Sequence, residues 1–317
     1  MNNRIIVKKN LFLSYIFHIL DLGNNDFDTE YSIAFKDIVE EKDKELLREL
    51  RSYLSYYNGS EGKLFDVMVR LPAYLGLNSP EDFKKYWYLL ETCLQKEDFT
   101  DFEVYYNNRY LQFDFWQGFS TENYLNSIRD YSDLMKDIID IYYRNFEKFK
   151  NNVWCKEKNM LSSRANEIEA SVNGIDIVGK WELFGNIVFE PENMEFFIVS
   201  SIQNNIKAIS LGFERKVLSG NFPTEQYKDI ITYETGLNLF NPYLKKLIQN
   251  SKYPIRLIYN CYEAVLYYFT KIITENEFLL CKPENKVICD IVQNMISEGF
   301  EDFHELFDNV LEAVTKQ

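Results

Sequence analysis

The order of hydrophobic patterns along the chain most restricts its fold. From about residue 10 to 165, apolar residues recur mainly at helical spacing, and from 224 to the end they do so again. Near residue 172 the pattern changes to short β-rich runs separated by turn residues. The runs cover 175–184, 187–189, 196–199 and 208–213. This order indicates an α+β fold that is mainly helical, with a small antiparallel or mixed sheet preceding a pair of helices.

Local signals place several of the predicted elements. Ser79 followed by Pro80 marks a helix start, with Ser79 as the cap and Pro80 in the first turn. We expect further helices from 120 and over 130–150, and a short edge strand at 4–8, whereas 103–115 fits either a hairpin or a helix. For the domains, we expect a mainly helical region at 1–170 and a sheet plus C-terminal helices at 171–317, packed as one continuous unit.

Composition and charge exclude several classes of function. The chain has 317 residues and a net charge of −14, so it offers no basic surface for nucleic acid or an anionic membrane. No segment reaches the roughly 18 uncharged apolar residues of a membrane-spanning helix. Its five cysteines are dispersed and odd in number, which favours buried thiols in a reducing compartment, the cytoplasm. The sequence does not indicate an oligomeric state.

Two lone carboxylates stand out in the C-terminal helical region. Glu234 is the only charge between Ile230 and Leu244, and Glu263 is the only charge in a second helix at 257–270. A helix that is uncharged on all sides is usually buried, and a buried carboxylate must be paired, protonated or metal-bound. The two could face each other if their helices are neighbours. Alternatively, each bonds separately to tyrosine hydroxyls, asparagine amides or helix N–H groups.

The surroundings of Glu234 resemble a known family. A β-sheet, a helix with Ile-Ile-x-x-Glu and a second helix with a lone Glu are similar to the gluzincin metallopeptidases, whose first helix carries His-Glu-x-x-His. In that family the two histidines bind zinc and the glutamate activates the zinc-bound water. The segment 233–237, running into Asn241-Pro242 where we expect the helix to end, also resembles a bacterial group of poorly characterised peptidase-like proteins.

The resemblance implies a degenerate zinc site. Glu234 stands at the general-base position and Glu263 at the place of the third ligand, but Tyr233 and Leu237 occupy the two histidine positions. Gly236 matches the small residue that often precedes the second histidine. Tyr259 and Asn260, just before Glu263, belong to the same remnant region. We therefore expect no metal and no cofactor, and a non-catalytic peptidase homologue that binds a peptide or protein in a remnant cleft.

Other interpretations remain open at this point. The chain contains only two histidines, His18 in an apolar helical pattern and His304 in what reads as a surface helix, and neither has a ligand-spaced partner. Glu234 and Glu263 could hold a hard cation weakly, or act as a glycosidase-type pair across an open cleft. An active hydrolase or peptidase that uses Glu234 with an atypical or absent metal site is one alternative. A helical scaffold or interaction protein unrelated to peptidases is another.

Overall fold

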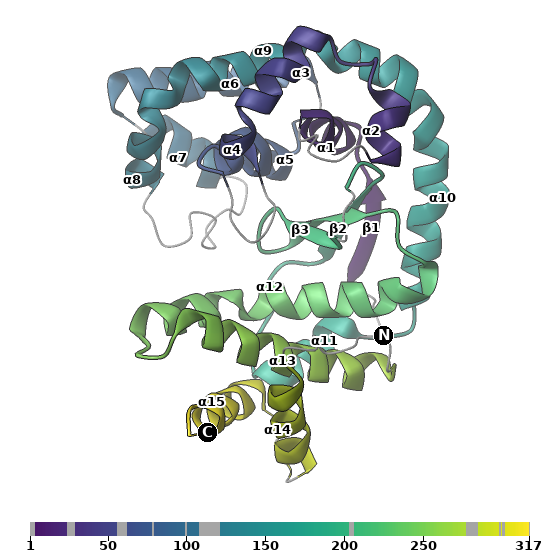
Figure 1. Cartoon of the computed structure of the whole chain (residues 1–317), viewed down its shortest axis with the longest axis vertical. Coiled ribbons are helices and arrows are strands. Elements are labelled where there is room, and N and C mark those ends of the chain that lie inside the picture. Colours follow the sequence, from purple (N-terminus) through teal and green to yellow (C-terminus); the bar gives the residue numbers. More distant parts are fainter. Residues whose placement is uncertain are drawn as a thin grey trace. The chain divides into compact units, whose positions relative to one another are not determined.

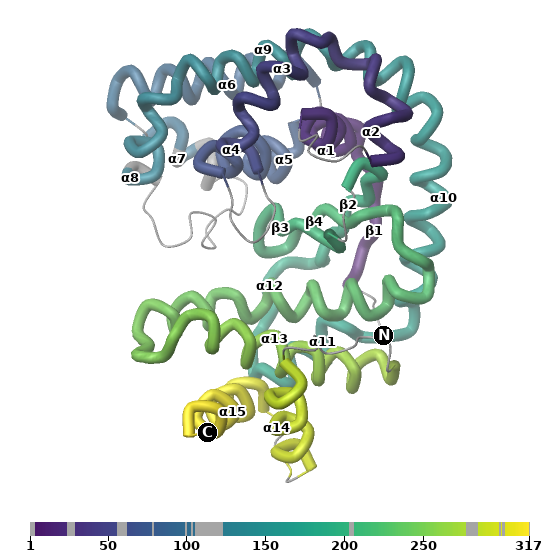
Figure 2. Tube along the Cα trace, in the orientation of Figure 1, coloured from purple at the N-terminus to yellow at the C-terminus, as the bar shows by residue number. Residues whose placement is uncertain are grey.

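The structure is a computed structural model that describes the chain except residues 1–3, 24–28, 56–61, 78, 99, 108–120, 203–205, 277–284, 298, 300, 301 and 317. It is 73% helical and contains one small mixed sheet of four strands, so the α+β class predicted from the sequence is confirmed. Figures 1 and 2 label these helices and strands and colour the chain from purple at the N-terminus to yellow at the C-terminus.

The chain folds into two compact units, each assembled from segments that are distant in sequence. Unit 1 comprises Met1–Ile6, Glu167–Glu195 and Phe222–Gln317, and unit 2 comprises Val7–Asn166 and Phe196–Asn221. The change of character expected near 170 therefore falls close to a unit boundary, while 196–221, which the sequence places with the C-terminal region, is in unit 2.

Unit 2 is built from helices around one apolar core. Helix α1 (Leu11–Gly23) lies at its centre, with every residue from Phe12 to Gly23 buried. Its other helices and helical turns are α2 (Glu30–Phe35), α3 (Glu41–Glu49), α4 (Arg51–Leu54), η1 (Asp66–Arg70), α5 (Leu71–Leu75), α6 (Pro80–Lys96), α7 (Thr100–Asn107), α8 (Thr121–Ile128), η2 (Arg129–Tyr131), α9 (Ser132–Phe149) and η3 (Lys150–Trp154), and α10 (Cys155–Val172) begins here and ends in unit 1. The core of unit 2 draws on α1 (Leu11–Gly23), α5, α6 and α9.

The predicted helix starts in unit 2 are confirmed. The Ser79 side chain accepts a hydrogen bond from the Asp82 N–H, and Pro80 opens α6. Helix α8 begins at Thr121, and α9 with η2 covers most of the predicted 130–150 helix. In the ambiguous segment 103–115, the residues up to Asn107 belong to α7, so helix is correct there; the rest lies outside the described residues.

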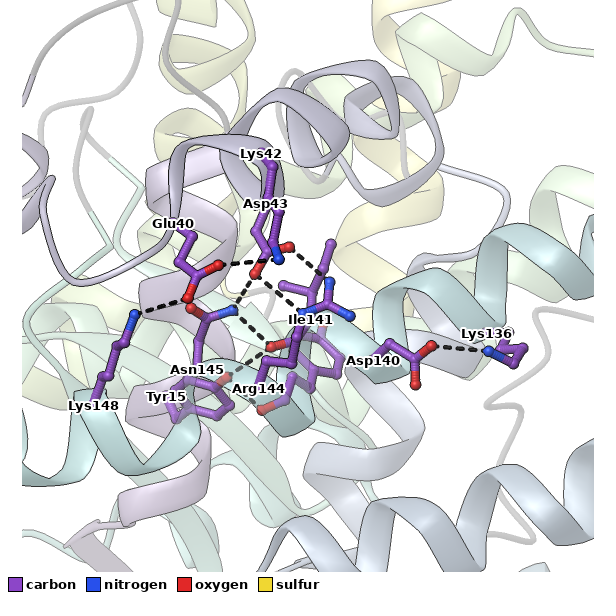
Figure 3. A network of polar contacts seen from close by, with 11 residues as sticks. Tyr15, Glu40, Lys42, Asp43, Lys136, Asp140, Ile141, Arg144, Asn145 and Lys148 are labelled. Carbon is purple, nitrogen blue, oxygen red and sulfur yellow. Dashed lines mark hydrogen bonds and ion pairs between the residues drawn. The ribbon is translucent and has the colours of Figure 1, made fainter.

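An ion pair between buried Asp43 and exposed Arg144 fixes α3 to α9 in unit 2. The Asp43 carboxylate accepts hydrogen bonds from the Arg144 guanidinium at 2.6 Å and from the Asn145 amide at 2.7 Å (Figure 3). Lys148 of α9 also donates to Glu40, at 3.2 Å, beside this pair. Burial raises the pKa of the Asp43 carboxyl, but the hydrogen bonds from Arg144 and Asn145 more than offset that effect, and the pKa lies below its ordinary value. The network therefore ties the two helices together and has a structural role.

The sheet has the strand order β1-β2-β4-β3, so its first strand comes from the N-terminus. The strands are β1 (Ile5–Lys9), β2 (Met194–Val199), β3 (Ala208–Ser210) and β4 (Arg215–Ser219). β3 and β4 pair antiparallel, with Ala208 opposite Leu218 and Ser210 opposite Lys216. The strands expected at 4–8, 196–199 and 208–213 are thus present in whole or in part, and β4 is a strand that the sequence pattern did not reveal.

Unit 1 contains α11 (Ile177–Gly185), η4 (Thr224–Gln226), α12 (Tyr227–Asn250), α13 (Ile255–Thr274), α14 (Lys286–Ser297) and α15 (Phe303–Thr315). Helices α12 and α13 form an antiparallel hairpin, and α14 and α15 pack on α13. Two sequence expectations are wrong in this unit. The segment 177–185 is a helix rather than a strand, and 187–189 belongs to no strand.

Helical spacing explains the first correction. Ile177, Trp181 and Gly185 recur every four residues and are buried, and the Asp176 side chain caps the helix by accepting from the Gly179 N–H at 2.9 Å. The end of a second helix was also misplaced: α12 does not stop at Asn241-Pro242 but continues to Asn250 with Pro242 inside it. Leu244 extends the buried face across the proline, and packing of this face outweighs the missing backbone hydrogen bond.

The cysteines differ in part from the expected buried thiols. Cys93 and Cys261 are free and buried, but Cys155 is free and exposed and Cys289 is disulfide-bonded. Among the helices of the described ranges, none has both the length and the apolar character that crossing a membrane requires.

Candidate functional site

Helix α12 carries the predicted site because its sequence buries nearly all of its first half. From Tyr227 to Phe240, every side is packed except at a few partly exposed positions, among them Tyr233 and Leu237. Glu234 is 8% exposed, as expected for a lone charge in an uncharged helix. Glu263 lies on α13, the antiparallel neighbour of α12. The two carboxylates are therefore on adjacent helices, as the resemblance requires.

A glycine sets how closely α11 approaches α12. The Trp181 indole is fully buried, and its Nε1–H donates to the Thr232 carbonyl oxygen at 2.9 Å. An added Cβ at Gly236 would lie 2.6 Å from Cε2 of this indole, which is closer than real Cβ atoms approach other atoms. The small residue at 236 is thus explained by packing of the tryptophan on the outside of the motif helix, independently of any metal.

The face of α12 that the resemblance assigns to zinc contacts tyrosines of α13. Tyr233 and Leu237 are four residues apart and lie on one face of α12. The Tyr233 ring stacks on the Tyr267 ring, with centroids 4.7 Å apart and planes 22° apart. The Tyr262 hydroxyl donates to the Leu237 carbonyl oxygen at 3.2 Å. The two positions where histidines would stand are therefore engaged in aromatic and backbone contacts.

Both carboxylates act on the same pair of phenols. Burial raises the pKa of Tyr233 well above its ordinary value, and Tyr267, Glu263 and Glu234 add to this effect. Burial also raises the pKa of Tyr267 to about 12, again with Glu263 and Glu234 contributing. Glu234 and Glu263 thus lie within electrostatic range of the stacked rings from two different helices. We call the partly exposed set Tyr233, Leu237, Glu263 and Tyr267, together with buried Glu234, the α12–α13 seam.

The seam does not favour a phenolate as a metal ligand. A phenol binds a metal in its ionised form, and burial together with two nearby carboxylates opposes ionisation of Tyr233 and Tyr267. Leu237 has no donor atom in its side chain. In the parts of the chain that the structure describes, no three or more His, Cys, Asp or Glu side chains gather as a metal ion would need.

The two histidines lie elsewhere. His18 belongs to unit 2 and is fully buried in α1, as expected for a core histidine. His304 is the second residue of α15, and its ring centroid lies 4.3 Å from that of Tyr243 and 5.6 Å from that of Phe240. It is therefore half-buried rather than a surface residue. Neither is drawn into the seam.

The other predicted site residues sit at the margin of the seam. Tyr259 is 46% exposed one turn before Glu263, and Asn260 is partly buried beside it. Tyr259 is close enough to Tyr262 to help raise its pKa, after the larger effect of burial. Tyr262 and Tyr267 were missed as site residues in the sequence, although their spacing from Glu263, one before and four after, places Tyr267 on the face of Glu263.

Chemically, the seam offers carboxylates, neutral phenols and aromatic ring faces. These groups can accept and donate hydrogen bonds and contact apolar side chains, but they include no imidazole or thiolate among the described residues. Comparison with known proteins adds no relative: no family model, no curated protein and no solved structure matches the chain.

Proposed function

We propose that the chain is a non-catalytic relative of the gluzincin peptidases that binds a peptide or protein segment at the α12–α13 seam instead of hydrolysing it. The observation that carries this proposal is the Tyr233–Tyr267 stack, which occupies the position of the first zinc-binding histidine and contacts the helix that bears Glu263. Glu234 and Glu263 on neighbouring helices support the shared scaffold.

Peptide binding suits the chemistry of the seam. Aromatic side chains supply large contact areas at low conformational cost, and tyrosine combines such a face with a hydroxyl that can hydrogen-bond a peptide backbone. Tyr259 and Asn260 extend the seam toward solvent, where Tyr259 is 46% exposed. Because the net charge of the chain is −14, a peptide with positive charge is the favoured partner class.

Restoring the histidines tests the scaffold. In Tyr233→His/Leu237→His, two imidazoles four residues apart would meet Glu263 from α13 and form a His₂Glu zinc site. We expect this variant to bind stoichiometric zinc by isothermal titration calorimetry, and the wild-type protein to bind none. A double variant with no gain in zinc affinity would count against the alignment with gluzincins, and stoichiometric zinc in the wild type would sink the non-catalytic assignment.

Two control variants distinguish a three-ligand zinc site, which includes Glu263, from weak zinc binding by any two histidines four residues apart on a helix. Adding Glu263→Gln to the double variant should weaken zinc at least about tenfold, or about 1.4 kcal/mol, because the third ligand is lost. Lys246→His/Asn250→His places the same spacing on an exposed part of α12 and should also bind zinc at least about tenfold more weakly. Equal affinity in all three would mean that α13 contributes nothing.

A binding assay tests the seam itself. A fluorescein-labelled, unstructured peptide rich in lysine serves as the probe, with fluorescence polarisation reporting binding and fragment release reporting cleavage. We expect the protein to bind the probe, and Tyr259→Ala to bind it more weakly. We expect no cleavage that depends on a metal, that is, none that a chelator abolishes. Cleavage lost in Glu234→Gln would instead favour the hydrolase alternative.

A cytoplasmic location is also part of the proposal. The free thiols Cys93, Cys155 and Cys261 favour a reducing compartment, whereas the disulfide at Cys289 counts against it. Labelling of the thiols with a maleimide in intact and lysed cells would decide between the two.

A further inference from the structure

A cluster of buried titratable side chains joins α1 to the short helix α2 in unit 2. His18 is fully buried and Asp21 is 3% exposed. The Nδ1 atom of His18 is 2.9 Å from the Tyr31 hydroxyl, and Thr29 Oγ1 donates to Asp21 Oδ2 at 3.3 Å. Each of these contacts links α1 to α2 or to its N-cap, Thr29.

Helix α2 depends on these contacts because it is short. It spans six residues, of which Tyr31 and Ser32 are buried, while Ile33 is 55% exposed. Its apolar hold on α1 comes mainly from aromatic rings: Tyr31 and Phe35 lie 5.6 Å and 6.2 Å from the His18 ring. A helix of this length is not stable in isolation, so loss of these contacts should release it.

A third titratable group faces the cluster from α10. Glu157 is 8% exposed, shares a hydrogen bond with Ser200 and helps to raise the pKa of Tyr31, after the larger effect of burial. Among the described residues, His18 Nε2 and Glu157 Oε2 have no hydrogen-bond partner. Burying such groups is unfavourable, and exposing them to water would relieve that cost.

The buried charged side chains of α3, a helix that packs on α1, have ion-pair partners outside the cluster. On α3, Asp43 pairs with Arg144 of α9 and Lys44 pairs with Glu41. The pKa of His18 is lowered to about 3 by burial alone. Burial raises the pKa of Asp21 to about 7 against the opposing hydrogen bond from Thr29, and burial also raises that of Glu157.

We propose that α2 is a detachable strap whose hold on α1 is set by two buried groups that act in opposite directions, the Asp21 carboxyl and the His18 imidazole. Opening the strap brings both groups to water, so Asp21 releases a proton and His18 takes one up. Glu157 acts in the same direction as Asp21.

The proton count gives the pH dependence of opening. Asp21 passes from a pKa of about 7 in the closed state to about 3.8 in water, so rising pH favours opening across that range and not above it. His18 passes from about 3 to about 6.5, so falling pH favours opening across that range. Between about 3.8 and 6.5 the two effects cancel, and Glu157 sets the remaining slope. Above 6.5 the acids act alone and the strap loosens.

Hydrogen exchange of the α2 amides measures opening directly. The Ser32 N–H bonds Thr29 Oγ1 at 2.9 Å and the Ile33 N–H bonds the Thr29 carbonyl oxygen at 3.0 Å, so both amides report closure. After correction for intrinsic exchange, we expect opposite slopes in two variants between pH 5 and 6.5. Relative to the wild type, the opening equilibrium constant of Asp21→Asn should rise by about tenfold for each pH unit of acidification. That of His18→Gln should rise by about tenfold for each pH unit in the alkaline direction.

Control variants make the outcome decisive. Thr29→Val removes the cap and its hydrogen bond to Asp21 but no titratable group, so between pH 5 and 6.5 it should raise opening without changing the slope. Glu157→Gln should shift the slope in the direction of Asp21→Asn. Parallel slopes in the wild type, Asp21→Asn and His18→Gln would overturn the proposal. So would amides of α12 in unit 1 that follow the same pH dependence, because this would mean that exchange requires global unfolding.

Discussion

Replacement of Gly236 by alanine probes the close contact between α12 and the Trp181 indole of α11 in unit 1. The methyl group would lie 2.6 Å and 2.8 Å from Cε2 and Cη2 of Trp181. The indole cannot move away easily, since it is fully buried and its ring centroid lies 5.6 Å from that of Phe240 and 6.1 Å from that of Phe269. Its hydrogen bond to Thr232 fixes the remaining direction.

Three effects set the size of the change. Forcing an extra methyl group into a packed interior costs about 1–3 kcal/mol. Displacing the indole weakens its hydrogen bond, worth about 1 kcal/mol, while alanine gains about 1 kcal/mol over glycine in a helix. The last two effects nearly cancel, so Gly236→Ala should lower the free energy of unfolding by about 1–3 kcal/mol.

A double-mutant cycle tests whether the tryptophan is the cause. In a Trp181→Leu background the contact disappears, and Gly236→Ala should then be neutral or stabilise by up to about 1 kcal/mol through helix propensity. Urea unfolding followed by circular dichroism measures all four proteins, and Trp181→Phe supplies a milder background. If Gly236→Ala destabilises equally with and without the indole, the packing explanation of Gly236 is wrong.

Three further outcomes follow from the contacts described above. Asp43→Ala removes the acceptor of Arg144 and one of the two acceptors of Asn145, and should lower the free energy of unfolding by about 2–3 kcal/mol, measured by urea unfolding at pH 7. Because the folded-state pKa of Asp43 is depressed, its stabilisation is present above pH 3.8 and is lost as pH falls further, so the deficit should shrink at pH 2–3; an undiminished deficit there would contradict the ion pair. Asp21→Asn should be relatively more stable at pH 8 than at pH 4, because the raised pKa makes the wild-type carboxyl lose stability as pH rises toward about 7; thermal melts at both pH values check this. Tyr262→Phe removes one buried hydroxyl that donates to a backbone carbonyl and should cost about 1 kcal/mol, with Tyr259→Phe as the exposed control.

Much of the candidate site could be predicted because its signals are local. A single charge within an uncharged helical run predicts a buried carboxylate, and Glu234 is buried. Two such runs with a short connection predict neighbouring helices, and α12 and α13 are neighbours. The aromatic stack was not predicted, because Tyr233 and Tyr267 are distant in sequence and a tyrosine gives no sign of which ring it will meet.

The errors in the fold have a similar origin. Short apolar runs are ambiguous between strand and helix, and 177–185 became a helix because its buried positions recur every four residues and Asp176 caps it. Pro242 did not end α12 because the buried face continues beyond it. β4 was missed because its pairing with β3, rather than a long alternating pattern, defines it as a strand.

The sequence by itself determined the mainly helical α+β class, the small sheet before the helix pair, and the burial of the lone glutamate on α12. Periodicity and the placement of charge decide these features, and both are written into short stretches of chain. Only the tertiary structure decided that Tyr233 stacks on Tyr267, that Trp181 packs on Gly236, and that His18 and Asp21 secure α2. Those features depend on which surfaces meet. Close packing between two segments distant in sequence cannot be read from the sequence of either segment alone.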